Sequence, residues 1–486
     1  MEQTPEKRVD VAVVGAGAAG IFAALVAARE GARVALVSRR PLDQSASYWA
    51  QGGIAAALAH GDSPDRHYAD TLNAGRGLSR ESTTRILCDE SPDRVRDLER
   101  LGVRFDADRH GALALGLEGG HTARRVVHAG GSATGRRITR QLIARAANHE
   151  RIEVLEWTTA ESLWVHEGRC VGLRAQTRDG RGILLMAGGT ILATGGAAAL
   201  WERTTNPRGA IGAGMTLAHA AGAELADLEF QQFHPTALAL PGPHDGFLVS
   251  EAIRGEGATL LDASGERFVD ELAPRDEVAI AIARRLADGP VHLDMRALAP
   301  NRFPNIASTL TEAGIDPRRE LVPVAPAAHY TMGGIATGVD GRSSLPGLYA
   351  IGECACNGLH GANRLASNSL ADCFVFGRRA ALAGTAEPGP PPTPVPAPPP
   401  GPNPVPAPDT RAALWRLAGL ERDPASLREL SDDPFPLARL IARSALAREE
   451  SRGAHRRTDH PRVDPELSGM HSVVGASGEP RMVRWR

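Results

Sequence analysis

The chain has 486 residues, of which 42% are hydrophobic and 23% are charged, and its formal net charge is −2. This balance is typical of a soluble globular protein of two or three domains, without a general attraction to nucleic acid or membranes. Lys7 is the only lysine, which excludes a pyridoxal enzyme and a Walker-type phosphate loop, since both need a lysine in the site.

The cysteines and the apolar N-terminus favour a cytoplasmic protein. The five cysteines are scattered without a C-x-x-C pair, which argues against an iron–sulfur centre, a zinc ribbon and a disulfide framework. Residues 11–28 are apolar enough to mimic a membrane span, but glycines interrupt them and no basic segment precedes them. We therefore expect neither a signal peptide nor a membrane anchor.

The first 40 residues predict a βαβ unit with a nucleotide-binding turn. Val9 to Val14 predicts a strand, the following segment a helix that ends at Gly31, and Arg33 to Ser38 a second, parallel strand. The turn between the first strand and the helix reads Gly15, Ala16, Gly17, Ala18, Ala19, Gly20. Such a G-x-G-x-x-G turn lets the backbone approach a pyrophosphate at a helix N-terminus, so we expect it to bind a dinucleotide.

The identity of the dinucleotide stays open at this point of the chain. NAD-binding proteins usually carry an acidic residue after the second strand, whereas Ser38, Arg39 and Arg40 stand here. The arginines could equally suit the phosphate of NADP. The turn alone therefore does not decide between NAD, NADP and FAD.

Later segments predict that the sheet domain is split. Further buried strands are expected at Thr190 to Thr194 and at Gly347 to Ile351, and the intervening stretch is rich in Arg, His and Pro. A proline-rich linker and amphipathic helices follow. The predicted divisions are a nucleotide-binding domain in two parts at 1–228 and 330–385, an inserted α+β capping domain at 229–329, a linker at 386–408 and a C-terminal helical domain at 409–486.

The segment from Ser45 to Ala56 resembles the flavin-contacting loop of the succinate dehydrogenase, fumarate reductase and L-aspartate oxidase family of flavoproteins. Further strings resemble the motifs of this family in order. They are Glu229–Thr236 with its H-P-T, Ser250–Gly257 with its E-x-x-R-G-E-G, Ala273–Asp276 with its P-R-D, His329–Gly334, Ile351–Glu353, His360–Leu370 and Glu450–His455. The resemblance therefore covers nearly the whole chain.

The resemblance implies an α/β fold, in which a Rossmann-like FAD-binding domain is split by the capping domain and followed by the helical domain. It also implies FAD as the cofactor. The residues expected to contact it are Gly15, Ala16, Gly17, Ala18, Ala19, Gly20, Ser38, Arg39, Ala46, Ser47, Tyr48, Gln51, Gly52, Gly53, Glu353, Ser369 and Leu370. Respiratory members carry a histidine that bonds covalently to the flavin, but Tyr48 and Trp49 occupy that neighbourhood here, so FAD is expected to be non-covalent.

Within the family, the Ser38-Arg39 ending and the run from Glu118 to His128 resemble the L-aspartate oxidases. This resemblance implies oxidation of L-aspartate to iminoaspartate, with electrons passed to oxygen, giving peroxide, or to fumarate, giving succinate. The reaction would be the first step of NAD biosynthesis, with a quinolinate synthase consuming the product. A soluble fumarate reductase or succinate dehydrogenase flavoprotein is the alternative enzyme. An electron-transfer or docking subunit with a vestigial site is the alternative from another class.

The expected substrate site has groups of both charges. Its cationic and donor side chains are predicted to be Arg254, Arg275, Arg364, His234 and His329, since guanidinium groups grip carboxylates at two points. Glu118 is predicted to face the ammonium of aspartate, and a carboxylate there would repel a substrate without an amine. Family analogy makes Arg275 the catalytic residue and its proton donor or acceptor. An arginine is a poor base, so we assign it orientation and charge stabilisation.

One position departs from the family pattern. The family usually has an aspartate between two glycines after the T-T-N-P string, whereas Gly212-Ala213-Gly214 stands here. The sequence therefore predicts that a cofactor contact is missing and that FAD is retained weakly.

Overall fold

The structure is a computed structural model of the chain, which describes residues 5–299, 302–392, 395–401 and 404–485. The remaining residues belong to the ends of the chain, the predicted capping domain and the predicted linker. Residues 1–4, 300–301, 393–394, 402–403 and 486 thus lie outside the described residues.

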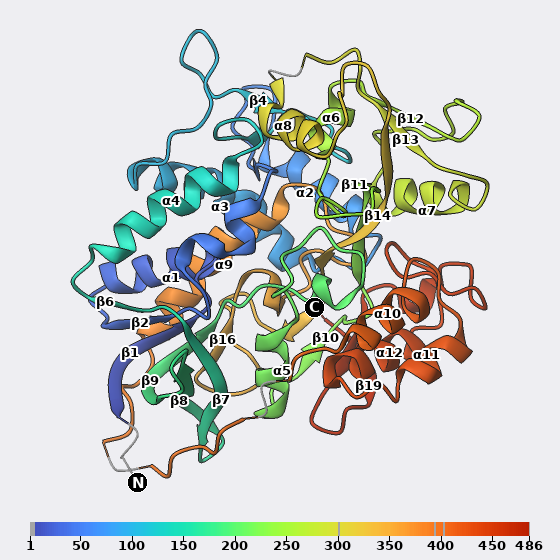
Figure 1. The fold of residues 1–486 in the computed structure, drawn as a ribbon. Helices are drawn as coiled ribbons and strands as arrows, with labels where there is room; N and C mark the ends of the chain where they lie inside the picture. Colours follow the sequence, from blue (N-terminus) through green and yellow to red (C-terminus); the bar gives the residue numbers. More distant parts are fainter. Residues whose placement is uncertain (1–4, 300–301, 393–394, 402–403, 486) are drawn as a thin grey trace.

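A largely parallel sheet forms the FAD-binding half of the molecule (Figure 1). Its strand order is β6-β2-β1-β9-β8-β7, and β16 also pairs with the C-terminal part of β9. The strands are β1 (Glu6–Val14), β2 (Val34–Val37), β6 (Ile152–Leu155), β7 (Thr158–His166), β8 (Arg169–Thr177), β9 (Gly182–Leu192) and β16 (Leu348–Ala350). The apolar residues of β1 and β2 are buried on both faces, as parallel strands between two layers require.

Helices cover this sheet and bury its apolar side chains. They are α1 (Ala18–Arg29), α3 (Glu81–Arg100), α4 (Thr134–Ala147) and α9 (Asn368–Thr385), which lie together in Figure 1. Phe22 of α1 and Phe374 of α9 meet edge to face with ring centroids 5.2 Å apart. This contact joins the beginning of the FAD-binding domain to its return after the inserted segment. No helix among the described residues is long and apolar enough to cross a bilayer.

The inserted segment folds on a second, antiparallel sheet with its own core. The strand order is β11-β14-β13-β12, formed by β11 (Gln231–Leu238), β12 (Thr259–Leu261), β13 (His292–Asp294) and β14 (Val322–Thr331). The helices are α6 (Glu251–Gly255), α7 (Arg275–Arg285) and α8 (Pro304–Glu312). Figure 1 shows this capping domain in yellow and green, at the top right of the view.

Smaller elements connect the two domains. Strands β3 (Ile54–Ala55), β4 (Leu115–Gly116) and β5 (Val126–Val127) form one small sheet. Strands β10 (Leu225–Ala226), β15 (Gly334–Ala336), β17 (Ala355–Cys356), β18 (Met470–Val474) and β19 (Pro480–Arg484) form another. The remaining helices of these connections are α2 (Pro64–Ala74) and α5 (Ala213–Ala220).

The C-terminal segment is helical only in its first half. Helices α10 (Pro408–Leu417), α11 (Pro424–Leu430) and α12 (Pro436–Ala447) come first, and the chain then ends in the hairpin β18–β19. The prediction of a helical domain over 409–486 missed this hairpin. Its formation depends on a distant partner, because β18 pairs with β10, whose Leu225 and Ala226 face Val474 and Val473.

The described part of the proline-rich segment lies against the main sheet. Trp164 of β7 donates its indole hydrogen to the carbonyl oxygen of Pro396 at 2.9 Å, and Ser162 donates to that of Pro399 at 2.8 Å. Val395 is buried in one apolar cluster with Trp164. A proline-rich segment has carbonyl groups but few N–H groups that need partners. It can therefore lie along the outer strands of a sheet and accept hydrogen bonds from their side chains.

A buried ionic network attaches the C-terminal segment to the start of the capping domain. The guanidinium of Arg448 donates to Glu229 at 2.7 Å and to Glu450 at 3.0 Å, and these three side chains are fully buried. Arg452 donates to both oxygens of Glu450 at 2.8 Å. Glu229 lies two residues before β11, so the network holds the chain where the capping domain begins.

We expect Arg448→Met to destabilise the protein by about 3–5 kcal/mol, because it leaves Glu229 buried without its cation, while Glu450 keeps Arg452 alone. Chemical denaturation of the purified variant measures this cost. Arg416→Met is the matched control, since Arg416 pairs with Glu429 at the surface, where an ion pair contributes less than about 1 kcal/mol. If both variants lowered the free energy of unfolding by the same amount, the stabilising role of the buried network would be contradicted.

Candidate active site

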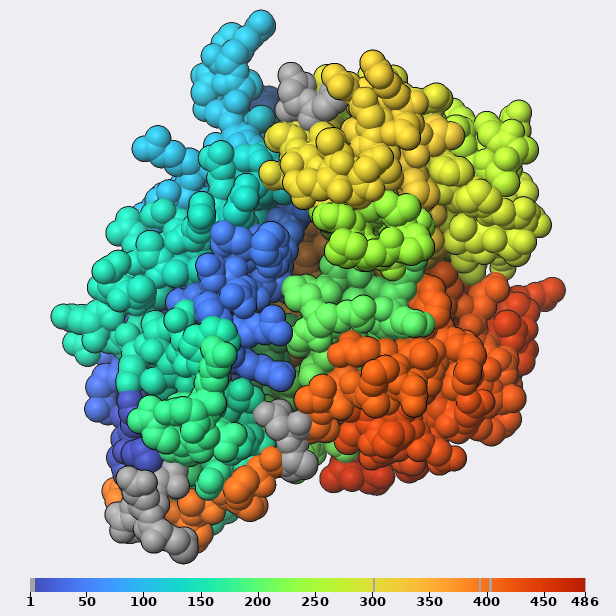
Figure 2. Space-filling view, viewed as in Figure 1, coloured from blue at the N-terminus to red at the C-terminus, as the bar shows by residue number. Residues whose placement is uncertain are grey.

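A cavity of about 740 Å³ lies between the FAD-binding and capping domains. Its size is within the range of about 300–1,000 Å³ that is typical of ligand sites. It runs from the glycine turn after β1, past the loop that contains Ser45 to Gly53, to the charged side chains of the capping domain. In Figure 2 the surface is hollowed between the blue N-terminal part and the green middle part of the chain.

The glycine turn brings backbone to the end of the cavity. Gly15 has φ +109°, and a Cβ there would lie 2.2 Å from the carbonyl oxygen of Ala193. A Cβ on Gly20 would lie 1.9 Å from the carbonyl oxygen of Gly15. Only glycine therefore allows helix α1 to start this close to β1 and β9, with its N-terminal dipole directed at the cavity.

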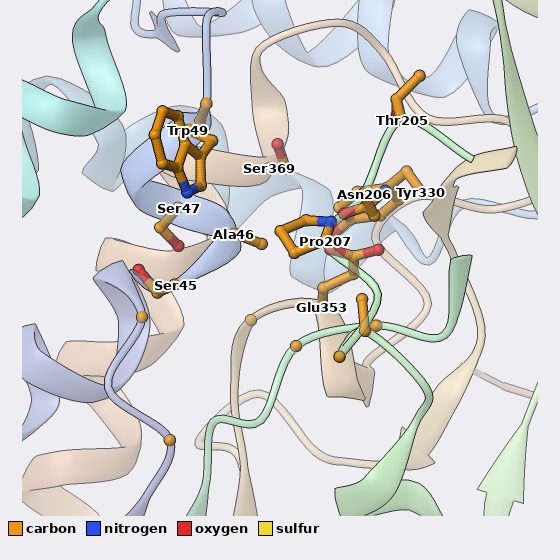
Figure 3. A pocket seen from close by; sticks show the side chains of 18 of the residues that line it. Ser45, Ala46, Ser47, Trp49, Thr205, Asn206, Pro207, Tyr330, Glu353 and Ser369 are labelled. Atoms are coloured by element: carbon orange, nitrogen blue, oxygen red, sulfur yellow. The ribbon is translucent and has the colours of Figure 1, made fainter. Parts of the chain in front are cut away.

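The loop after β2 and the segments opposite it form the two walls of the cavity. Figure 3 shows Ala46 and Ser47 on one side and Pro207 and Glu353 on the other, with Ser369 between them. Ser47 accepts a hydrogen bond from the backbone N–H of Ala18 at 3.1 Å, so the loop also caps helix α1. The loop and the glycine turn are thus held as one unit.

Glu353 is a buried carboxyl group at the cavity wall, and it accepts a hydrogen bond from the backbone. Burial raises its pKa to about 7, although the N–H of Thr331 donates to its carboxyl group at 3.0 Å. A carboxyl with this pKa can donate or accept a hydrogen bond near neutral pH. It therefore suits the hydroxyl groups of a nucleotide cofactor.

Most of the predicted cofactor residues line the cavity. These are Gly15, Ala16, Gly17, Ala19, Ser38, Arg39, Ala46, Ser47, Gln51, Gly52, Gly53, Glu353, Ser369 and Leu370. Ala18, Gly20 and Tyr48 are not among the lining residues. Ala18 and Gly20 serve the close packing of the turn, and the ring of Tyr48 packs edge to face on Trp49 at 5.4 Å.

At the other end of the cavity, two arginines contact one carboxylate. Arg275 Nε donates to Glu251 Oε2 at 2.6 Å, and Arg254 Nη2 lies 3.4 Å from Glu251 Oε1. Burial opposes ionisation of Glu251, but Arg275 and Arg254 hold its pKa below the ordinary value. Its Oε1 has no hydrogen-bond partner among the described residues. Glu251 is therefore an ionised carboxylate that keeps acceptor capacity beside the cavity.

Gln232 couples the two arginines that face the cavity. Its side-chain oxygen accepts from Arg275 Nη1 at 3.1 Å and from Arg364 Nη1 at 3.2 Å. Its amide nitrogen donates to Asn363 Oδ1 and to the carbonyl oxygen of Arg364, both at 2.9 Å. Because every hydrogen-bonding group of Gln232 is used, its amide orientation is determined, and the two guanidinium groups are held at one oxygen.

Two neutral histidines complete the polar wall. The rings of His234 and His329 lie 5.1 Å apart, and burial, followed by the charge of Arg275, holds both pKa values well below the ordinary value. His234 Nδ1 accepts from the N–H of Thr236 at 3.2 Å, so its proton is on Nε2. His329 Nδ1 is 2.7 Å from Thr205 Oγ1. Both rings can thus present an N–H donor without adding charge.

Glu118 lies on the FAD-binding side of the same cavity. It is buried, and its Oε2 accepts from Ser367 Oγ at 2.7 Å. Ser367 in turn accepts from the N–H of Gly53 at 3.2 Å and has φ +60° before helix α9. The carboxyl group is therefore held close to the cofactor loop by a serine whose own backbone is strained.

Arg254 is buried and is not among the residues that line the cavity. Helix α6 puts Glu251 and Arg254 one turn apart, and Arg254 Nη1 donates to the carbonyl oxygen of Glu271. The other predicted substrate residues, Glu118, His234, Arg275, His329 and Arg364, all line the cavity. The ion pair between Arg254 and Glu251 fits a supporting role for Arg254, and its contact with the substrate stays a prediction.

Four contributing residues were not predicted from the sequence. They are Thr205, Gln232, Glu251 and Ser367, whose contacts are described above. The spacing of Glu251 and Arg254, three residues apart, was the signal for an ion pair on one helix face. Nothing local marked Gln232 or Ser367, because the side-chain partners of both lie at least 43 residues away in the sequence.

We expect dicarboxylate affinity to be constant from about pH 7 to about pH 9 and to fall above it. Burial, followed by the charge of Arg275, lowers the pKa of Arg364 to about 10, so its positive charge is lost as the pH rises through that value. Succinate titrations of the flavin-loaded protein across this range measure the effect. An affinity that already falls between about pH 6 and 8 would instead indicate that His234 and His329 bind as cations.

Known proteins resemble the chain over nearly its full length. Residues 10–370 match the FAD binding domain family, and residues 427–485 match the fumarate reductase flavoprotein C-terminal family. The chain is 44% identical to the L-aspartate oxidase of Caulobacter vibrioides, over 97% of each chain. It is 42% identical to that of Streptomyces coelicolor, over 96% of this chain and 91% of the relative.

The chain belongs to the L-aspartate oxidase family. The family membership expected from the motifs is therefore confirmed, as is the FAD-binding fold with an inserted domain. A mutant of FrdA from the E. coli quinol fumarate reductase has the same fold, with a TM-score of 0.88 at 28% identity, over 99% of this chain and 96% of that chain. L-Aspartate oxidases and this fumarate reductase thus share one architecture.

FAD is the cofactor of this member of the L-aspartate oxidase family. The residues present fit the group, because the glycine turn leaves no room for a Cβ and faces the cavity. In addition, the buried atoms Gln51 Oε1 and Thr194 Oγ1 lack hydrogen-bond partners among the described residues, and Gln51 and Thr194 both line the cavity. FAD would supply the partners that these atoms need.

We expect Ala213→Asp to tighten FAD binding and the unmodified protein to lose FAD on dialysis. Ala213 lines the cavity and is the first residue of helix α5, where a carboxylate is favoured by the helix dipole and can accept from cofactor hydroxyl groups. One such hydrogen bond is worth about tenfold in affinity. The flavin-to-protein ratio after dialysis measures the difference. A stoichiometric, tightly bound flavin in the unmodified protein would contradict the expectation.

Proposed function

We propose that this chain oxidises L-aspartate to iminoaspartate with FAD as the electron acceptor. The observation that carries this proposal is the pairing of opposite charges around one end of the cavity. Arg275 and Arg364, with two neutral histidines, can hold carboxylates, while Glu118 offers a negative charge. L-Aspartate carries two carboxylates and one ammonium, so its charges complement this set.

The carboxylates of the substrate would meet donors that are already oriented. Arg364 Nε has no hydrogen-bond partner among the described residues, and its Nη2 donates to Ser369 at 2.8 Å. His234 carries its proton on Nε2, as described above. Donors that are held in place before binding lose little entropy when they contact the substrate. The planar guanidinium group also matches the two oxygens of a carboxylate.

The ammonium distinguishes aspartate from other dicarboxylates. Glu118 is the carboxylate next to the cofactor loop, held by Ser367. Facing an ammonium it would contribute a favourable charge pair, whereas facing the methylene of succinate it would be desolvated without a partner. We assign substrate discrimination to Glu118.

The redox chemistry of the proposed reaction, acceptance of a hydride, would be supplied by FAD when it is bound. Arg275 would bind at the reacting end of the substrate, orient it and stabilise negative charge, since its pairing with Glu251 fixes the direction of its guanidinium. Glu251, with Arg254 behind it, supports Arg275 and adds an acceptor whose second oxygen is free of hydrogen bonds among the described residues. The capping domain would exclude water from this end.

The proposal also covers the acceptor that reoxidises the flavin and the use of the product. We propose non-covalent FAD, reoxidation by oxygen to give peroxide or by fumarate to give succinate, and entry of iminoaspartate into NAD biosynthesis through a quinolinate synthase. The five cysteines are free and four of them are buried, which agrees with a reducing, cytoplasmic environment.

Anaerobic titration of the purified protein with L-aspartate, D-aspartate and succinate, followed by flavin absorbance, tests the proposal. We expect bleaching with L-aspartate, none with D-aspartate, and binding without bleaching for succinate. Arg275→Leu should abolish bleaching while the flavin spectrum persists. Reduction by succinate but not by L-aspartate would support the alternative, a soluble succinate dehydrogenase or fumarate reductase. An inert flavin with all three compounds would indicate a vestigial site in a docking subunit.

We expect Glu118→Gln to reverse the discrimination between the two dicarboxylates. The variant loses a charge-assisted contact to the ammonium, so kcat/KM for L-aspartate should fall on the order of 100-fold, while succinate should bind more tightly. Glutamine has nearly the size of glutamate and keeps an acceptor for Ser367. The variant therefore tests the loss of charge without a change in packing. Equal changes for both compounds would remove Glu118 from the role of specificity residue.

A further inference from the structure

A strained residue lies at the junction of the FAD-binding, capping and C-terminal parts of the chain. Arg76, in the turn between α2 and α3, has φ +56°. This left-handed conformation is unfavourable for a non-glycine residue, so the surroundings must hold it in place. Arg452 does so from the C-terminal segment, since its Nη1 donates to the carbonyl oxygen of Arg76 at 2.7 Å. The turn is thereby tied to the buried network of Glu450 and Arg448.

The side chain of Arg76 reaches from this turn to the first turn of helix α7. Its Nε and Nη2 each donate to Asp276, both at 3.2 Å, and Nη2 also donates to Glu277 at 2.5 Å. The side chain of Asp276 is 3% exposed and that of Arg76 is 27% exposed. The contact is therefore a two-point ion pair that is largely shielded from solvent, which is stronger than an ordinary surface pair.

Asp276 directly follows Arg275, so whatever fixes Asp276 also fixes the backbone of Arg275. Side chains one position apart on a helix point in different directions. Asp276 faces Arg76, while Arg275 faces Glu251 and Gln232. Among the described residues, Arg76 is the cation that pairs with Asp276. Without it, a buried carboxylate would be left without a cation at the residue that directly follows Arg275.

We propose that Arg76 is a positioning residue for the reaction: by gripping Asp276 it holds the start of helix α7, and with it Arg275, against the FAD-binding domain. This inference rests on the proposed function, because it concerns the residue that binds the reacting end of the substrate. It differs from a stabilising role, because it acts on the placement of one guanidinium group. A displacement of about 1 Å at such a group is enough to lower a rate by about 100-fold.

Arg76→Ala, Arg76→Lys and a matched control test this inference in the flavin-loaded enzyme. The control is Arg284→Ala, since Arg284 lies on the same helix and pairs with Glu421 of the C-terminal segment, but at the surface and far along the helix from Arg275. We expect Arg76→Ala to lower kcat for L-aspartate about 10- to 100-fold with a smaller change in KM. Arg76→Lys should be intermediate, because lysine keeps the charge but not the two-point geometry. Arg284→Ala should leave both constants unchanged.

Hydrogen exchange of the α7 amides in the presence of succinate supplies a readout that does not depend on turnover. Exchange should accelerate in Arg76→Ala and stay unchanged in Arg284→Ala. Asp276→Asn, which removes the other partner, should lower kcat similarly, and the double variant with Arg76→Ala should lose little more than either alone. If Arg76→Ala does not fold, Arg76→Lys and Asp276→Asn carry the same comparison.

The outcomes separate this inference from the proposed function. Kinetic constants for Arg76→Ala equal to those of Arg284→Ala, or additive effects of Arg76→Ala and Asp276→Asn, would overturn it. A fall in stability with unchanged kcat would also overturn it. If the wild-type flavin is not reduced by L-aspartate, the proposed function fails. The exchange of α7 would then still show whether Arg76 holds this helix.

Discussion

The candidate active site depends on holding several arginine side chains close together in a region that is buried from water. Arg254, Arg275 and Arg364 converge on a buried region in which Glu251 is the carboxylate that pairs with two of them. Guanidinium groups stay charged when buried, so their repulsion must be balanced by fixed acceptors. Gln232 supplies one oxygen to two of the arginines, and a dicarboxylate substrate would supply the rest of the negative charge. The site is therefore prepared for an anion by its own unbalanced charge.

The charges come from different domains, so their proximity depends on how those domains pack. Arg275, Glu251 and Gln232 belong to the capping domain, whereas Arg364 and Glu118 belong to the FAD-binding domain. Glu229, two residues before β11, is held by Arg448 and by Ser472 of the terminal hairpin. Since β11 carries Gln232 and His234, the C-terminal segment anchors the strand that presents these two side chains to the cavity.

Local sequence signals were sufficient for the parts of the fold that depend on local chemistry. The βαβ unit, its glycine turn and the return of the sheet near Gly347 follow from apolar periodicity and from backbone positions that only glycine tolerates. The terminal hairpin escaped prediction, because β18 is stabilised by β10, more than 200 residues earlier. The proline-rich linker was predicted, but its contact with the main sheet was not, because composition does not show that Trp164 donates to a carbonyl oxygen of this segment.

The sequence by itself determined the cofactor class, the split domain order and the set of charged side chains available for a dicarboxylate with an amine. Those properties reside in residue types and short motifs. Only the tertiary structure decided which charges meet. It placed Arg254 behind Glu251, joined Arg275 to Arg364 through Gln232, and set Arg76 against Asp276. Such pairs join residues far apart in the chain, and their energies depend on distance and burial, which no local pattern specifies.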